Sequence, residues 1–322
     1  MRRLATVLFF VVSGCGSIGS VQAHSISLAY KAGDTYKYAL HAVLNYTIGA
    51  EGFSVPFNLD MTGKETITVK SVDSSGTADL TISLTDLSVK TTTNGTTNTT
   101  TTTTPTSVEM KVASDGRIVS MNGSTFTNGS LPGLSGTEGG LITAILPDKP
   151  VKPGDTWTKD YDQANPMGKG SIHVATKNKY LRDEQVKNVN TSVVESNIAT
   201  TIDVTIDMSA MAGQGGTPLF PSTGGASGLQ SLSMKGTTTS VVTSWIDASA
   251  HRVAKTHSSG TLDATMTLNM TAGGTTPGLT GPITFKGTQT MDMNPAWRRR
   301  DPRRSRIRAQ DRAGVRRDGA PV

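Results

Sequence analysis

Apolar residues alternate with small or polar residues along most of the chain from Ser25 onward. The clearest stretches with an apolar residue at every second position are 26–30, 67–69, 80–84, 202–208 and 262–270. Turn-forming residues lie at 73–76, 114–116 and 258–260. A period of two is typical of β-strands with one buried and one solvated face, and β-branched threonine suits the solvated face. We therefore predict an all-β protein of antiparallel sheets, a sandwich or an open barrel, with very little helix.

Two pairs of similar segments occur in the same order along the chain. The segment 31–36, Lys-Ala-Gly-Asp-Thr-Tyr, recurs 121 residues later as 152–157, Lys-Pro-Gly-Asp-Thr-Trp. The segments 112–119 and 246–253 form the second pair, and each is typical of a strand, a tight turn and a return strand. Matched order makes coincidence a poor explanation, so we predict that the fold is built from a duplicated β unit.

The repeat sets the expected organisation of the chain. The first β unit covers residues 24–146 and the second covers residues 147–296, each with an insertion at the same point. In the first unit the insertion is a loop at 91–106, where twelve of sixteen residues are Thr and little apolar surface is available to offset ordering. In the second unit it is a Gly/Pro/Ser-rich loop at 210–232.

The first repeated motif is interpreted as structural. We expect each glycine to have a positive φ or to lie in a tight turn, each aspartate to bond nearby backbone N–H groups, and each aromatic ring to be buried in a core. Trp245 is expected to be a core anchor in the same way. The six motif residues are Gly33, Asp34, Tyr36, Gly154, Asp155 and Trp157.

Residues 1–23 have the features of an export signal. Two arginines precede an apolar run at 4–12, which is too short to span a bilayer but fits the apolar region of a signal peptide. The following Val-Ser-Gly-Cys resembles a bacterial lipobox, which implies lipidation of Cys15 and attachment to the membrane. Cleavage after Ala23 is the alternative and would release a secreted chain. Both interpretations place the protein in or beyond the cell envelope.

The formal charge of +6 comes from the C-terminus alone. Residues 298–322 contain ten arginines and three aspartates, a net charge of +7, which leaves −1 for the rest of the chain. A nucleic-acid arm is the alternative to a solvated extension. Because no aromatic residue follows Trp297 to stack on bases, we predict a disordered tail at 297–322 and no nucleic-acid partner.

Two segments resemble an uncharacterised family of bacterial secreted β-rich proteins and lipoproteins. These are Leu28 to Tyr38 and Leu146 to Trp157, and the resemblance extends over about residues 26–295. More weakly, Ser244-Trp-Ile-Asp followed by a turn is similar to a hairpin of periplasmic lipoprotein and lipid carriers with a half-barrel fold. Neither family has catalytic residues, so the resemblance implies none here.

The sequence contains no catalytic or cofactor-binding motif. Its single cysteine excludes an internal disulfide framework and a cysteine-based zinc site. We therefore predict a non-enzymatic envelope lipoprotein without a cofactor, a binding or scaffold module whose partner is an envelope protein or an apolar ligand. The first alternative is a periplasmic carrier of an apolar ligand. A remote alternative is a copper protein that uses His24 as its N-terminal residue together with His41, His173 or His251.

Overall fold

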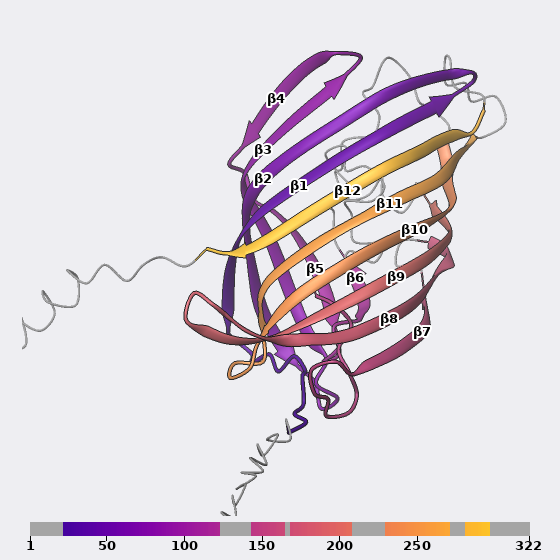
Figure 1. Cartoon of the computed structure of the whole chain (residues 1–322). Helices are drawn as coiled ribbons and strands as arrows, with labels where there is room; N and C mark the ends of the chain where they lie inside the picture. Colours follow the sequence, from indigo (N-terminus) through magenta and orange to yellow (C-terminus); the bar gives the residue numbers. More distant parts are fainter. Residues whose placement is uncertain (1–21, 123–142, 165–167, 208–228, 271–280, 297–322) are drawn as a thin grey trace, which may run out of the picture.

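Twelve antiparallel β-strands form one strongly curved sheet (Figure 1). The computed structural model describes residues 22–122, 143–164, 168–207, 229–270 and 281–296. These ranges contain no helix, and so none that is long and apolar enough to cross a membrane. The prediction of an all-β antiparallel protein is confirmed. The sheet curls into a nearly closed barrel and does not form a sandwich of two sheets.

The strand order shows how the two halves of the chain are joined. Each half winds as a meander, and the two meanders meet where β1 pairs with β12, giving the order β6-β5-β3-β2-β1-β12-β11-β10-β9-β8-β7, with β4 paired to β3. The strands are β1 (Thr35–Ala50), β2 (Phe53–Val72), β3 (Ala78–Thr93), β4 (Thr96–Thr102), β5 (Thr106–Val112), β6 (Ile118–Asn122), β7 (Thr156–Ala164), β8 (Gly168–Val186), β9 (Val189–Asp207), β10 (Leu229–Asp247), β11 (Val253–Met270) and β12 (Ile283–Pro295).

The alternation read from the sequence defines an inner and an outer face of the sheet. Along β1, Leu40 and Leu44 are buried on the inner face, whereas His41 and Asn45 are exposed on the outer face. The same period of two continues around the sheet and gives one hydrophobic core. Trp245 departs from the expectation of a core anchor, because it follows an inward-facing serine on β10 and so lies on the outer face beside Lys255.

The Thr-rich segment 91–106 is not a loop, so that prediction is wrong. It forms the end of β3, a turn at Asn94 and Gly95, and the exposed strand β4. Both turn residues have positive φ, +49° and +77°, as a tight two-residue hairpin requires. Threonine favours strands because it is β-branched, and backbone pairing to β3 orders the segment without any apolar core.

Two further predictions of loop and turn positions differ from the structure. The predicted loop 210–232 gives way to β10 from Leu229 onward, and the predicted turn 258–260 lies in the middle of β11, where it pairs with both neighbouring strands. A glycine in a strand is therefore not always a turn signal. Cys15 and the tail 297–322 lie outside the described residues, so lipidation and disorder remain predictions.

Candidate functional site: the inner face and closed end of the barrel

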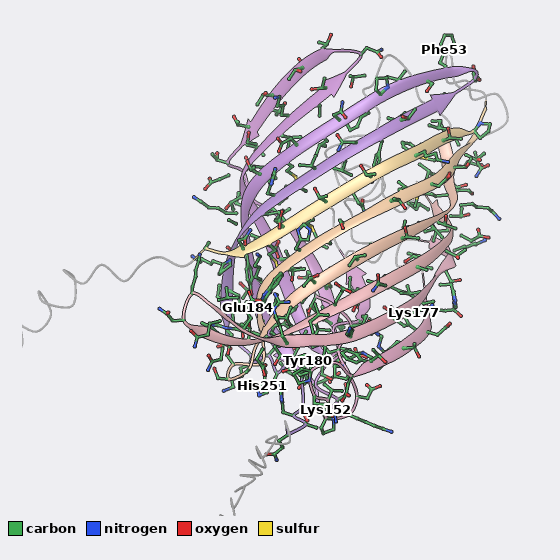
Figure 2. All side chains as sticks on the ribbon, in the orientation of Figure 1. Phe53, Lys152, Lys177, Tyr180, Glu184 and His251 are labelled. Carbon is green, nitrogen blue, oxygen red and sulfur yellow. The ribbon has the colours of Figure 1, made fainter. Side chains whose placement is uncertain are left out.

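The inner face of the barrel is largely apolar, although buried serine, threonine and asparagine side chains interrupt it on β8 to β11. Both halves of the chain contribute fully buried side chains to its middle, including Leu44, Ile67, Leu80, Ile202, Met234 and Leu262. Toward the end that carries the β1–β2 turn and Phe53 (Figure 2), which we call the rim, inner-face side chains are only partly buried; these are Ile48, Phe57, Met61, Val89, Ile206 and Leu268. Apolar surface is thus better covered deep in the barrel than at the rim.

The opposite end, which we call the closed end, is crossed by two segments outside the strands. In the segment 143–151, the N–H of Ala144 donates to Ser244 Oγ (2.7 Å) and the N–H of Ile145 donates to Ser196 Oγ (2.9 Å). Both serines are inward-facing and buried. The N-terminal segment 22–34 lies alongside, with a β-bridge between His24 and Val151. These bonds explain why buried serines interrupt the apolar pattern on β9 and β10.

Side chains of the turn between β5 and β6 contact β7 and so link the two edges of the described sheet; we call this line the seam. Asp115, in the turn before β6, accepts hydrogen bonds from Lys159 Nζ on β7 and Arg117 Nε, both at 2.7 Å. Arg117 also lies over the ring of Tyr161 on β7. Burial raises the pKa of Asp115, but the bonds from Lys159 and Arg117 outweigh burial and lower that pKa below its ordinary value. The carboxylate is therefore ionised and paired.

Glu65 is the buried acid on the inner face of the described strands. It lies on β2 in phase with Ile67 and Val69, directly opposite Tyr38 of β1, and it is only 7% exposed. Burial raises the pKa of its carboxyl from 4.5 to about 7. No described residue makes a hydrogen bond or an ion pair with it. An acid with no partner on an apolar wall is rare in folded proteins.

The repeated Gly-Asp turns have equivalent backbone geometry in the two halves. Gly33 and Gly154 have φ of +88° and +97°, which confirms the expected conformation. The N–H of each glycine donates to a strand carbonyl, Val69 in one half and Tyr180 in the other, and the N–H of that strand residue donates back to the aspartate carbonyl. A register shift follows Val69 and another follows Tyr180. These matches support the predicted duplication.

The side chains of the repeated motif do not all match. The carboxylate of Asp155 accepts the N–H of Lys152 (2.9 Å), as expected. Asp34 instead accepts the hydroxyl of Tyr36 (2.8 Å), so the expected backbone bond is replaced. The Tyr36 ring is buried, whereas Trp157 is partly buried and donates its indole N–H to a backbone carbonyl. The two aspartates belong to different turns and do not share a cleft.

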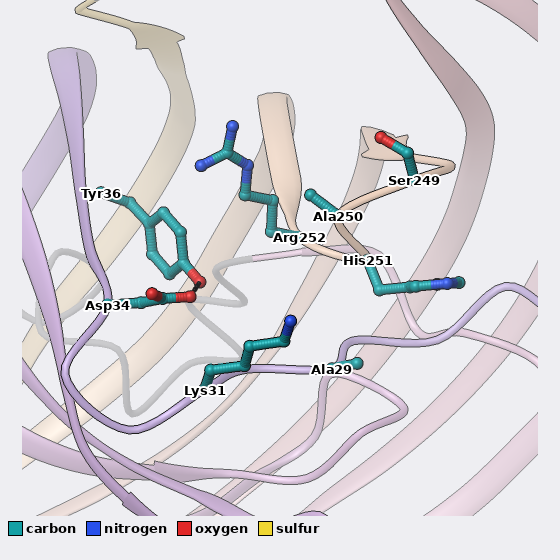
Figure 3. Close-up of a pocket in the computed structure, with 8 residues that line it drawn as sticks. All are labelled: Ala29, Lys31, Asp34, Tyr36, Ser249, Ala250, His251 and Arg252. Carbon is teal, nitrogen blue, oxygen red and sulfur yellow. Dashed lines mark hydrogen bonds between the residues drawn. The ribbon is translucent and has the colours of Figure 1, made fainter.

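A small pocket lies where the first motif meets the β10–β11 turn (Figure 3). Its volume is about 170 Å³, below the ~300 Å³ of the smaller ligand sites. Figure 3 shows the Tyr36 hydroxyl directed at Asp34, with Arg252 over the Tyr36 ring and Lys31 and His251 nearby. Burial and the bond to Asp34 raise the pKa of Tyr36, which stays protonated. These contacts join the two halves and leave little room for a ligand.

The histidines named for the copper alternative lie apart. The Nε2 atom of His24 lies within hydrogen-bond distance of Ser192 Oγ (3.1 Å) and the Tyr180 hydroxyl (3.2 Å). His41 and His173 are on the outer face, each beside an aspartate of its own. Within the described ranges, no group of three or more His, Cys, Asp or Glu side chains could hold a metal ion.

Comparisons with known proteins add little to this geometry. No family model and no curated protein matches the chain. Among solved structures, the chain is similar to DynF from the dynemicin biosynthesis pathway of Micromonospora chersina, at 8% identity and a TM-score of 0.21, over 86% of this chain and 87% of that chain. A likeness at this level carries no functional argument. The resemblance to bacterial secreted proteins and lipoproteins stays a prediction.

Sequence reasoning missed Glu65 and the seam. Glu65 follows Lys64 and precedes Thr66, a polar run in which no residue stands out. The one available signal was its phase, since Glu65 occupies the apolar position of the stripe that includes Ile67 and Val69. Lys159 and Asp115 are 44 residues apart, and only the curvature of the sheet brings them together.

Proposed function

We propose that the protein is a non-enzymatic carrier that holds an apolar ligand against the inner face of its barrel. The observation that supports this proposal is the largely apolar inner face, to which leucine, isoleucine and methionine of both halves contribute. In a sandwich, a second sheet would cover such a face. Here one sheet curls around it, and the described ranges contain no second sheet or helix packed across it.

The two ends of the barrel suit a carrier in different ways. The closed end is tied by the bonds from Ala144 and Ile145 to inner-face serines, and both residues are fully buried. At the rim, Phe57 and Met61 remain partly exposed, and Phe53 is the most exposed large apolar residue described, at 76%. Partly exposed apolar surface beside a deep apolar wall is typical of a ligand entrance.

The proposed location is the cell envelope, with Cys15 as a lipid anchor. The short apolar run before Val-Ser-Gly-Cys supports this part of the proposal. Cells that express the wild type should incorporate a fatty-acid analogue into the protein, and Cys15→Ala should abolish the label. Equal labelling of the two proteins would refute the anchor without affecting the carrier proposal.

Ligand binding is tested with a neutral, polarity-sensitive dye such as Nile red. We expect the dye to bind the delipidated wild type and a natural apolar extract to displace it. Met61→Glu places a charge on the inner face and should weaken binding at least about tenfold. Thr62→Glu, the neighbouring outer-face position, should bind like the wild type. Absence of dye binding, or equal loss in both variants, would refute the proposal.

A further inference from the structure

Three acidic side chains are buried in the described part of the chain, and two of them are paired. Asp115 is held by Lys159 and Arg117. Asp247 accepts backbone N–H groups of its own hairpin turn and lies beside a cation. Glu65 alone has neither a hydrogen bond nor an ion pair with any described residue. Its partner is therefore to be sought outside these residues, in what the inner face binds.

The surroundings of Glu65 are aromatic and apolar. Tyr38 lies directly opposite on β1, and Leu84 lies opposite on β3. Tyr30, from the segment that crosses the closed end, is close enough for the Glu65 charge to contribute to raising its pKa, after burial and Tyr36. The Tyr30 hydroxyl also makes no hydrogen bond with a described residue. The Tyr30 hydroxyl and the Glu65 carboxyl are thus near enough to interact electrostatically at the base of the inner face.

Besides burial, the charge of Glu65 contributes to the raised pKa of both Tyr30 and Tyr38. The Tyr38 hydroxyl donates to the carbonyl of Val253 (2.7 Å), which leaves its oxygen free to accept. The Tyr30 hydroxyl can both donate and accept, whereas an ionised Glu65 carboxylate only accepts. No lysine or arginine contacts Glu65 in the described ranges, and burial accounts for its raised pKa. A buried carboxylate in such a place is costly unless a cation joins it.

We propose that the ligand of the inner face is an amphiphile with a protonated amine at one end, which pairs with Glu65 while its apolar chain extends along the inner face toward the rim. This inference rests on the carrier function proposed above. An ammonium group carries a positive charge and three N–H donors, so it can pair with the Glu65 carboxylate and still donate to a nearby tyrosine oxygen. The tyrosine rings add attraction for a cation. A carboxylate head group would instead meet a like charge.

Compounds with one chain length and different head groups test the inference. Displacement of Nile red from the wild type is measured with dodecylamine, N-dodecylacetamide, dodecanol and dodecanoate. We expect dodecylamine to bind at least about tenfold more tightly than the acetamide, because acetylation removes the charge and keeps the chain. Dodecanoate should be the weakest of the four. This comparison needs no variant and so does not depend on how a substitution folds.

Variants then assign the preference to Glu65. Glu65→Gln should remove the preference for dodecylamine and leave dodecanol binding within about threefold of the wild type. Glu109→Gln, on the outer face of β5, is the matched control and should keep the preference. If all four compounds bind the wild type equally, or Glu65→Gln retains the preference, the inference is overturned and the carrier function stands. If none of the four binds, the carrier function itself fails.

Discussion

The two halves of the chain meet along two lines that are held together in different ways. Between β1 and β12 the backbone ladder is continuous, from Tyr38 opposite Pro295 to Ala50 opposite Ile283. Along the seam, β6 and β7 are the edges of the described sheet, and side chains of the turn before β6 contact β7, including Asp115 with Lys159. One junction is built from many cooperative bonds, whereas the other depends on a few groups.

Backbone pairing differs between the two junctions although the halves are similar. In each half the last hairpin lies next to the first strand of the other half. The strand β12 pairs along β1, whereas the described residues of β6 pair only with β5 and those of β7 pair only with β8. Short edge strands and charged side chains at an edge limit pairing. We infer that the β1–β12 junction carries the stability of the barrel and that the seam opens more readily.

The largest effect is expected at the β1–β12 junction. A side chain at Gly287 would collide with the backbone oxygen of Asn45 and the ring of Tyr46. Gly287→Val should therefore lower the free energy of unfolding by about 4 kcal/mol, measured by urea denaturation. Thr288→Val, the next residue on the exposed outer face, is the control and should change stability little. A loss of less than about 1 kcal/mol in Gly287→Val would show that this junction tolerates strain.

Removing the buried charge of the seam should have the next largest effect. Asp115→Ala leaves Lys159 without its buried partner and should cost about 3 kcal/mol of stability in urea denaturation. Glu109→Ala breaks the exposed pair with Lys70 on the outer face and should cost less than about 1 kcal/mol. Equal effects of the two substitutions would mean that the seam contributes no more than an ordinary surface ion pair.

The unpaired Glu65 and the paired Asp115 should give opposite pH dependences. The raised pKa of Glu65 means that the folded state holds a proton that the unfolded state releases, so its contribution is present below pH 4.5 and is lost as the pH rises to about 7. The loss should be about 2–3 kcal/mol in the wild type and absent from Glu65→Gln. Asp115 has a lowered pKa, so its contribution is lost as the pH falls below its ordinary 3.8. The measurement is the free energy of unfolding of the wild type and of Glu65→Gln at a series of pH values between 4.5 and 8. Parallel curves for these two proteins would contradict the prediction for Glu65.

The smallest effect on stability is expected for removal of the Tyr161 ring at the seam. Tyr161→Leu removes the contact under Arg117 and should cost about 1 kcal/mol. The contact of Lys255 with Trp245 on the outer face is the comparison, and Lys255→Met should cost a similar amount, about 1 kcal/mol. If Tyr161→Leu has no effect on the melting temperature, the cation–π contact does not hold the seam.

The all-β class and the repeat could be predicted because both depend on local patterns. Alternation of apolar and polar residues fixes which face of a strand is buried. The Gly-Asp pair of the repeated motif predicts a turn in both halves, and both glycines have the positive φ that such a turn needs. The pattern misled at residues 91–106, where backbone pairing orders a strand with hardly any apolar residue. It also misled at Trp245, whose size suggested a core position although its phase places it on the outer face.

The candidate site could not be predicted because it depends on curvature. A stripe of apolar residues is the same in a sandwich and in a barrel, and only the closure of the sheet turns it into an inner wall. Glu65 interacts electrostatically with Tyr30, which belongs to another segment of the chain. Asp115 forms its ion pair with Lys159, which lies on the opposite edge of the sheet. Contacts between residues that are far apart in the sequence cannot be predicted from the spacing of neighbouring residues.

The central claim is that an apolar chain lies along the inner face, and methionine methyl groups report on it directly. Met61, Met234, Met266 and Met291 are inner-face residues of β2, β10, β11 and β12. The measurement is an NMR spectrum of the protein labelled with ¹³C at its methionine methyl groups, recorded with a nitroxide-labelled long-chain alcohol. The account predicts that these four signals broaden together at one equivalent of ligand and recover when the nitroxide is reduced. Sharp signals from all four, in a sample where the alcohol is shown to be bound, would contradict it.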